Sequence, residues 1–554
     1  MNRNNEAHFA LQPTAEIGRS KFERPHSLHT SMSEGDIVPI FCEQYVPGDT
    51  IKMRMSSIVR MMTPIVPVMG DAVLDVYFFN VPWRLVWEHT KQFVGENDTS
   101  PWVNPTEYEI PQIEAPASTG WDVKSLAVYL GEPAGVPELT TNALKFRAYA
   151  CIYNNWFRSE AVQTPVYMHM DDTTATGKNY DANTYNAVTD TELGAKLLKA
   201  CKTFDYFTGC LPEAQAGNPV MIPLGQNAPV IGSKPKEKFA NVGTFDTDLI
   251  DKPVGIYRDT SQNYAFYDSS VTTGIGLGAS ESIGLSVDLS QAVGATITQL
   301  RQAFQIQKWQ ERAGMVGQRF GEVIKGHFGV TNPDYRNMIP EYLGGYRSAI
   351  SVNQVVQTSS TDAVSPQGNT AAYSVTVDRK DDLFTKSFTE WGIIMGLAVV
   401  RVKNHVYQQG QNREWAKKKK FDFYWPEFAN LSNQAVKNKE IYAQGPATVD
   451  SDGNIIDEQA FGYQECWAEM RYSPDRVSGE LRSDYAQSLD IWGYFDKYNS
   501  LPTLSDEWIK ENEDPIGHTL AVRNHDQFFG NFYFGSIWTR PMPVYSIPGL
   551  IDHH

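Results

Sequence analysis

The segment AVLDVYFFNVPWRLVW, from Ala72 to Trp87, has the composition of a buried β-strand. Successive side chains of a strand point to opposite faces, and here both sets are mainly apolar, as Val73 and Leu74 illustrate. Pro82 cannot donate a ladder hydrogen bond, so it ends the extended run. We therefore predict a strand that is covered on both faces and stops at Pro82.

Further strands are predicted on both sides of this segment. Residues 37–41 and 51–62 are rich in apolar and β-branched residues, and the turn residues Pro47, Gly48 and Asp49 separate them. Similar signals return at 371–377 and 391–402. Strands and helices do not alternate regularly, which argues against a doubly wound parallel sheet. The sequence predicts a mainly β fold.

Helices interrupt the strands rather than alternate with them. Apolar residues recur at helical spacing in 144–162, where they form an aromatic stripe that we interpret as core packing. Two more helices are predicted at 192–201 and 299–320. The region between them, 217–295, is rich in Gly, Asn, Asp, Ser and Thr and far exceeds the usual length of a loop. We interpret it as an insertion.

Composition and charge limit the possible classes of protein. The 554 residues are 41% hydrophobic and 20% charged, as expected for a folded chain with a large core. The start lacks a secretory signal and no apolar run reaches the length of a membrane helix, so we expect a soluble protein. The formal net charge of -17 opposes general attraction to nucleic acid, so any nucleic-acid surface must be local.

Motifs for catalysis, metals or cofactors are weak. The glycines at 274–278 lack the strand and helix that flank a phosphate-binding loop, and Asp450 begins a calcium-like motif that lacks its final Glu. We predict no catalytic residues, no metal and no cofactor. Reduced, mostly buried thiols are expected because the five cysteines form no CxxC pair: Cys42, Cys151, Cys201, Cys210 and Cys466.

One basic cluster stands out in this acidic chain. The aromatic segment FDFYWPEF follows it directly, at 421–428, and cations beside stacking rings are typical of surfaces that bind single-stranded nucleic acid. The alternative is a solvated charge run beside core aromatics. A weaker candidate is the amino-terminal arm, whose acids nearly cancel its bases. The predicted nucleic-acid-binding residues are Arg401, Lys403, Arg413, Lys417, Lys418, Lys419 and Lys420, with Arg3, Arg19, Lys21 and Arg24 in the arm.

Sequence blocks in collinear order span nearly the whole chain, among them VYFFNVPWRLVW, FDYFTGCLPEAQAG, HFGVTNPDYRNMIPEYLGG and RPMPVYSIPGLIDHH. Together they resemble the major capsid protein of microviruses, small icosahedral phages with circular single-stranded DNA, and most of all its gokushovirus-like branch. The resemblance implies an eight-stranded antiparallel jelly roll with long loop insertions and a few helices. It also implies a structural protein without enzymatic activity.

The same resemblance implies partners and a location. The subunit would assemble with copies of itself into a T=1 shell of sixty subunits around the single-stranded DNA genome. Other partners would be a DNA pilot protein, a small DNA-binding protein and a host cell-surface receptor. The protein would reside in the virion after assembly in the host cytoplasm. The competing hypothesis is a monomeric carbohydrate-binding or carbohydrate-cleaving β-sandwich protein.

Four regions are expected on this basis: an amino-terminal arm (1–36), a jelly-roll domain (37–540), a surface insertion within it (217–295) and a carboxyl-terminal arm (541–554). We expect the insertion to protrude at the threefold axes and to recognise the host; the alternative is a loop that covers the shell or locks neighbours. The apolar tail is expected to dock on a neighbouring subunit, the alternative being its own sandwich. Its predicted interface residues are Pro541, Pro543, Val544, Tyr545, Pro548, Leu550 and Ile551.

Overall fold

The computed structural model describes residues 17–97, 106–218, 220, 297–356 and 370–546, and four short strands between 230 and 287. The chain divides into two compact units, one made of residues 1–216 and 311–554 and the other of residues 217–310. In the second unit, β8 (Val230–Gly232) pairs with β11 (Leu285–Val287), and β9 (Val254–Arg258) pairs with β10 (Tyr264–Asp268). Both pairs are antiparallel.

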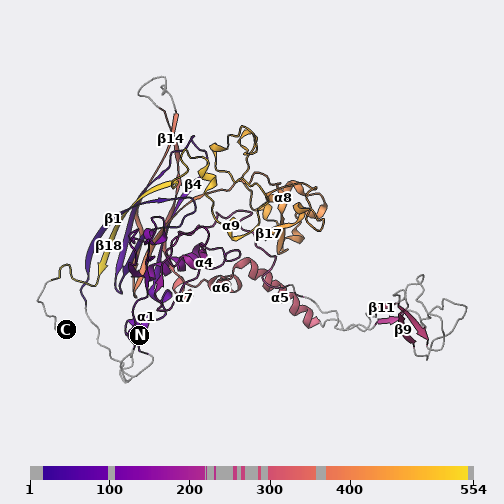
Figure 1. Ribbon diagram of the computed structural model, residues 1–554, viewed down its shortest axis with the longest axis horizontal. Coiled ribbons are helices and arrows are strands. Elements are labelled where there is room, and N and C mark those ends of the chain that lie inside the picture. The colour runs from indigo at the N-terminus through magenta and orange to yellow at the C-terminus, as the bar shows by residue number, and fades with distance from the viewer. Residues whose placement is uncertain are drawn as a thin grey trace. The chain divides into compact units, whose positions relative to one another are not determined.

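Two antiparallel sheets form the centre of the first unit (Figure 1). In spatial order, the first sheet contains β1 (Ser20–Met32), β18 (Phe528–Arg540), β3 (Thr50–Met61), β14 (Thr370–Ser387) and β13 (Val352–Val356). The second contains β12 (Glu341–Ile350), β4 (Ala72–Pro82), β15 (Gly392–Val402) and β2 (Val38–Tyr45). The fold is therefore mainly β, as the sequence predicts.

Phenylalanine rings fill the space between the two sheets. Phe41 and Phe78 come from the second sheet, and Phe384 and Phe534 come from the first. The ring centroids of Phe41 and Phe534 are 5.2 Å apart, and those of Phe78 and Phe384 are 5.6 Å apart. All four are buried, so the sheets pack face to face as a sandwich with an aromatic core.

The outer face of the second sheet is covered as well. Helix α3 (Leu144–Ile152) continues into a π-helical turn, Tyr153–Phe157, and the Tyr149 hydroxyl donates a 2.8 Å hydrogen bond to the Ile37 carbonyl. The rings of Trp156 and Phe157 lie 5.4 and 6.2 Å from Phe79 of β4. Strand β4 is thus buried on both faces and ends at Pro82, which confirms the prediction from its sequence.

The outer face of the first sheet remains exposed along its central strands. In β3, inward-facing Met53 and Met55 alternate with exposed Lys52 and Arg54, the period expected of a strand with one face in solvent. Strand β18 alternates in the same way. We call this surface the open sheet face; its outward-facing residues include Lys21, Glu23, Lys52, Arg54, Ile58, Arg60, Val377, Arg379, Phe529, Tyr533, Gly535 and Ile537.

A second apolar cluster lies in the long segments outside the sandwich. Tyr206, Phe207, Tyr407 and Trp508 are among its buried members. It supports a hairpin of β16 (Asn433–Lys437) and β17 (Ala460–Glu465) with the short helices α8 (Asn438–Ile441) and α9 (Asp506–Ile509). The remaining described strands and α-helices are α1 (Thr90–Phe93), β5 (Gln112–Glu114), α2 (Leu126–Tyr129), β6 (Thr140–Asn142), β7 (Ala175–Thr176), α4 (Ala187–Asp190), α5 (Ile297–Val316), α6 (Phe320–Phe328), α7 (Asp334–Asn337) and α10 (Asp514–Gly517).

The structure departs from the predicted elements at several places. No helix forms at 192–201; instead Lys199 is held in an extended segment by ion pairs of 2.9 Å to Asp36 and 2.7 Å to Glu513. The strands predicted on either side of Pro47 form, but they lie in different sheets, with Gly48 in the turn at φ +92°. Residues 20–32, assigned to the arm, pair along their whole length with β18.

The prediction of reduced, mostly buried thiols agrees with the described structure. All five cysteines are free thiols, and three of them are buried. Within the described ranges, no helix combines the length and apolarity needed to cross a lipid bilayer. No group of three or more His, Cys, Asp or Glu side chains in those ranges is arranged to hold a metal ion.

Candidate nucleic-acid interface

Arg401, the first residue of the predicted basic cluster, is an internal partner of β4. Its guanidinium contacts the Asp75 carboxylate and donates a 2.7 Å hydrogen bond to the Tyr77 hydroxyl. Arg347 of β12 binds the same carboxylate at 2.6 and 2.9 Å. Burial raises the pKa of Asp75, but the two arginines outweigh it and lower the pKa below its usual value. Arg401 therefore neutralises a buried acid.

Two further cations of the cluster also hold the fold together. Arg413 donates hydrogen bonds to the Ala435 carbonyl at 2.8 Å and to Glu440 at 3.0 Å. The Lys417 ammonium, whose side chain is 10% exposed, lies 3.0 Å from Glu469. Lys403, by contrast, is half-exposed and only 3.9 Å from Asp71. The contacts of Arg413 and Lys417 tie the segment after β15 to the hairpin of β16 and β17 and the turn that follows it.

The remaining lysines, Lys418 to Lys420, are exposed beside exposed rings. Trp415 is 80% exposed and Phe421 is 66% exposed, values that are unusual for such large apolar side chains. The Lys420 ammonium lies 5.6 Å from the Phe421 ring centroid and 5.4 Å from that of Trp425. We call this the lysine–aromatic surface; it comprises Trp415, Lys418, Lys419, Lys420, Phe421, Phe423 and Trp425.

The segment before these lysines separates two hollows. One, of about 420 Å³, is lined by Tyr407, Trp415 and Tyr472 among others. The second, of about 440 Å³, is lined by Phe421, Trp467 and several lysines. Arg413 borders both. The cluster thus combines cations, rings and concave surface, and its role in binding single-stranded nucleic acid stays a prediction.

The predicted arm cations have different surroundings. Arg24 forms an ion pair with Glu43 of β2, and its guanidinium lies 4.9 Å from the Trp538 ring centroid, so it closes one edge of the sandwich. Lys21 lies 3.7 Å from Glu23, and both are exposed. Arg19 is exposed. Arg3 lies outside the described residues.

The tail begins at a fixed anchor and then exposes apolar side chains. The Arg540 guanidinium lies 4.2 Å from the Trp538 ring centroid and pairs with Asp49 at 3.2 Å. Beyond it, Val544 is 57% exposed and Tyr545 is 79% exposed. Pro541 and Pro543 are also described, whereas Pro548, Leu550 and Ile551 lie outside the described residues.

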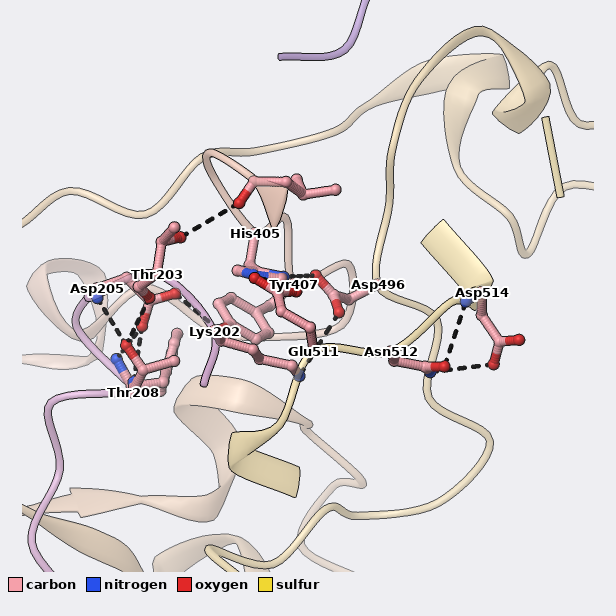
Figure 2. A network of polar contacts seen from close by, with 12 residues as sticks. Lys202, Thr203, Asp205, Thr208, His405, Tyr407, Asp496, Glu511, Asn512 and Asp514 are labelled. Carbon is pink, nitrogen blue, oxygen red and sulfur yellow. Dashed lines mark hydrogen bonds and ion pairs between the residues drawn. The ribbon is translucent and has the colours of Figure 1, made fainter. Parts of the chain in front are cut away.

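A buried ion network between the two apolar clusters had no sequence signal. Figure 2 shows His405 between Asp496 and Glu511, with distances of 2.9 Å from Nδ1 and 3.4 Å from Nε2 to their carboxylates. Lys202 lies 3.8 Å from Asp496. Burial lowers the pKa of His405, but the two carboxylates outweigh it and raise the pKa to about 10. The charged imidazole joins segments far apart in sequence, so no local motif could indicate it.

These features define a class of protein before any relative is considered. A β-sandwich carries two long insertions, 83–340 and 403–527, together with an exposed apolar tail and exposed cation–ring surfaces. The ion pairs of Arg401, Arg413 and Lys417 and the buried histidine stabilise the fold. The architecture is that of a structural subunit, consistent with a viral capsid β fold.

Comparison with known proteins identifies the family. The model of a phage family described as "Capsid protein (F protein)" matches residues 10–550, and the chain belongs to this family. Capsid protein VP1 of Spiroplasma virus 4 is 39% identical over 567 residues, covering 98% of this chain and 97% of that protein. Capsid protein VP1 of Chlamydia phage 1 is 36% identical, and the match covers 98% of this chain and 97% of that protein. Capsid protein VP1 of Bdellovibrio phage phiMH2K is 38% identical, and the match covers 99% of this chain and 98% of that protein.

The resemblance to microvirus capsid proteins is thus confirmed. The chain is a structural protein of the virion that assembles with copies of itself into a shell, and it is not an enzyme. Membership of a capsid protein family contradicts the competing hypothesis of a monomeric carbohydrate-binding or carbohydrate-cleaving sandwich.

Proposed function

We propose that this chain is the major subunit of a T=1 icosahedral shell that encloses a circular single-stranded DNA genome. The observation that carries the proposal is the similarity to capsid proteins VP1 along almost the entire length of both chains. A DNA pilot protein, a small DNA-binding protein and a host receptor are proposed as further partners.

We also propose that the sandwich is a jelly roll, and the strand order supports this. The eight long strands in chain order are β1, β2, β3, β4, β12, β14, β15 and β18. Numbered one to eight, they lie in the order 1-8-3-6 in the first sheet and 5-4-7-2 in the second. Two interlocked Greek keys generate this order, and jelly rolls are a recurrent capsid architecture.

The tail is proposed to reach a neighbouring subunit. Exposed Val544 and Tyr545 support this, because a single chain leaves their apolar surface in water, whereas contact with a neighbour would bury it. Pro541 and Pro543 restrict the backbone of the free tail, which lowers the entropy lost on docking.

The insertion 217–295 is proposed to protrude outward and to contact the host. Its acids outnumber its bases, so it is poorly suited to lie against DNA. The division of the chain into a separate compact unit over 217–310 supports an appendage that the sandwich does not need for its own packing. Copies gathered around a symmetry axis would gain avidity from several weak contacts.

Particle analysis tests the proposed function. The chain would be produced with its phage partners, and purified particles would be imaged by electron microscopy and assayed for nuclease-protected DNA. We expect uniform closed shells that contain circular single-stranded DNA. Isolated monomers, open sheets or shells of another symmetry would refute the T=1 assignment, and empty closed shells would refute genome enclosure by this chain.

A further inference from the structure

We propose that the open sheet face is the surface of this chain that contacts the packaged single-stranded DNA. This inference rests on the proposed enclosure of the genome and assigns the contact to β1, β18, β3 and β14. Sequence reasoning placed the contact elsewhere, on the basic cluster that ends at Lys420.

The charge of this face is opposite to that of the whole chain. Its outward-facing cations are Lys21, Lys52, Arg54, Arg60 and Arg379. The acids on or beside it are already paired: Glu23 with Lys21 at 3.7 Å, Asp382 with Lys52 at 3.7 Å and Asp381 with Arg379 at 2.8 Å. Among the described residues, Arg54 and Arg60 form no ion pair, so both guanidinium groups are available to phosphates.

Exposed rings stand beside these arginines. The register pairs Phe529 with Arg60 and Tyr533 with Ser56, so both rings point outward from the sheet. Phe529 is 43% exposed and Tyr533 is 47% exposed. Proteins that bind single strands combine two such elements, cations that follow the backbone and rings on which bases stack.

A groove crosses the strands between these groups. It has a volume of about 380 Å³ and is lined by Pro25, Arg54, Arg379, Tyr533 and Gly535, among others. Gly535 has no side chain to fill the groove, and a Cβ at this position would make only an ordinary contact, 3.6 Å from the Cβ of Arg54. A nucleotide in this groove could place its phosphate near Arg54 and its base near the Tyr533 ring.

Chain topology explains why this face is the uncovered one. Both long insertions leave from strands of the second sheet: 83–340 follows β4, and 403–527 follows β15. Helix α3 of the first insertion packs on that sheet. Figure 1 shows β1 and β18 on one flank of the first unit and α8 and β17 of the second insertion on the other.

In a closed shell, one flank of the sandwich faces the interior. The proposed outward segment, 217–295, belongs to the first insertion, and the lysine–aromatic surface belongs to the second. The flank without insertions carries the open sheet face with its net positive charge. Charge complementarity with the phosphate backbone therefore assigns this flank to the genome.

Paired variants in assembled particles test this assignment. The sheet variant carries Arg54→Gln and Arg60→Gln; the control carries Lys418→Gln and Lys419→Gln and removes the same charge from the lysine–aromatic surface. All four residues are exposed, so the fold should persist. We expect closed sheet-variant shells to lose nuclease-protected DNA, or to release it at lower salt than wild type, and control shells to retain it. Unchanged DNA in the sheet variant, or loss in the control alone, would overturn the inference.

Crosslinking of wild-type particles provides a second test that needs no variant. Ultraviolet irradiation followed by mass spectrometry would identify peptides joined to DNA. Nucleotide adducts on Phe529 or Tyr533 would support the inference. Adducts confined to Trp415–Trp425, or protein–protein crosslinks at Tyr533, would overturn it, the latter by identifying a neighbouring subunit as the occupant. Wild-type particles without any DNA would instead refute the proposed function.

Discussion

The imidazole of His405 lies 2.9 Å from the carboxylate of Asp496 in a position where the histidine side chain is 1% exposed (Figure 2). Glu511 faces the other ring nitrogen, and Lys202 and Glu34 complete the charged surroundings. A buried cation between two carboxylates stabilises the fold only while it stays protonated.

The network predicts a loss of stability at alkaline pH. The pKa of His405 rises from 6.5 in the unfolded chain to about 10 in the folded chain. Its contribution is therefore complete below pH 6.5 and is lost progressively as the pH approaches 10. Burial and the charge of Glu511 raise the pKa of Glu34 well above its usual value, which gives the same direction. Thermal unfolding between these pH values should show a falling Tm.

Two variants isolate the histidine. His405→Gln should flatten the pH dependence and lower stability at neutral pH by about 3–5 kcal/mol, because it leaves buried carboxylates without their cation. His29→Gln, at an exposed position of β1, should reproduce the wild-type profile. A wild-type slope retained in His405→Gln would contradict the assignment.

The aromatic core predicts that truncating two phenylalanines of β18 will lower the free energy of unfolding by different amounts. Phe534 is 0% exposed and packs against Phe41 and Phe78, so Phe534→Ala should destabilise the chain by about 3–5 kcal/mol. Phe529→Ala, on the exposed side of β18, should cost less than about 1 kcal/mol. Denaturant unfolding measures both, and equal losses would argue against the sandwich register.

Within the basic cluster, substitution of the partly buried arginine Arg401 should reduce stability, whereas substitution of the exposed lysine Lys418 should not. Arg401→Gln removes hydrogen bonds to buried Asp75 and should reduce stability by about 1.5–3 kcal/mol, with Arg347 retaining part of the pairing. Lys418→Gln should change stability by less than about 0.5 kcal/mol. Melting temperatures of the two purified variants would show whether Arg401 stabilises the fold. Equal melting temperatures would mean that Arg401 is not a structural residue.

The tail predicts an assembly defect without a folding defect. Val544→Ser with Tyr545→Ala should lower the yield of closed particles, because the proposed contact with a neighbour loses apolar area. The unassembled subunit should keep its unfolding temperature. Val123→Ser changes a residue that is 73% exposed elsewhere and serves as the control. Normal particle yield from the tail variant would favour docking of the tail on its own subunit.

The insertion predicts a separation of assembly from host attachment. Replacing Asn218 to Gly294 with a short Gly-Ser linker should leave closed particles intact, since lengthening or shortening a connection changes closure entropy little. Adsorption of these particles to host cells should fall. Normal adsorption would refute the recognition role, and failed assembly would favour a role in locking neighbouring subunits.

Sequence reasoning succeeded where local pattern and final burial agree. The two-sided apolar run of β4 and the helical stripe of α3 predicted both element type and packing correctly. The helix predicted at 192–201 does not form, because Lys199 forms ion pairs with Asp36 and Glu513 and these partners, distant in sequence, hold the segment extended. Local propensity has no information about such contacts.

Site prediction met the same limit. Arg401 and Lys418 belong to one basic cluster in sequence, yet Arg401 binds Asp75, 326 positions away, while Lys418 is exposed. The open sheet face was missed because its cations alternate with core methionines in β3 and come from three strands, β1, β3 and β14. Only the sheet register brings them onto one surface.

The pairing of β1 with β18 also governs when the subunit can be completed during synthesis. Strand β18 lies between β1 and β3, and Ser31 bonds Asp526, a residue 495 positions later. Before β18 has been synthesised, the first sheet therefore lacks the strand between β1 and β3, and the facing edges of these two strands are unpaired. Strand β18, the last of the described strands in chain order, fills this position, so the first sheet is complete only after β18 has been synthesised, and only then can the subunit offer its complete surface to neighbours in a shell.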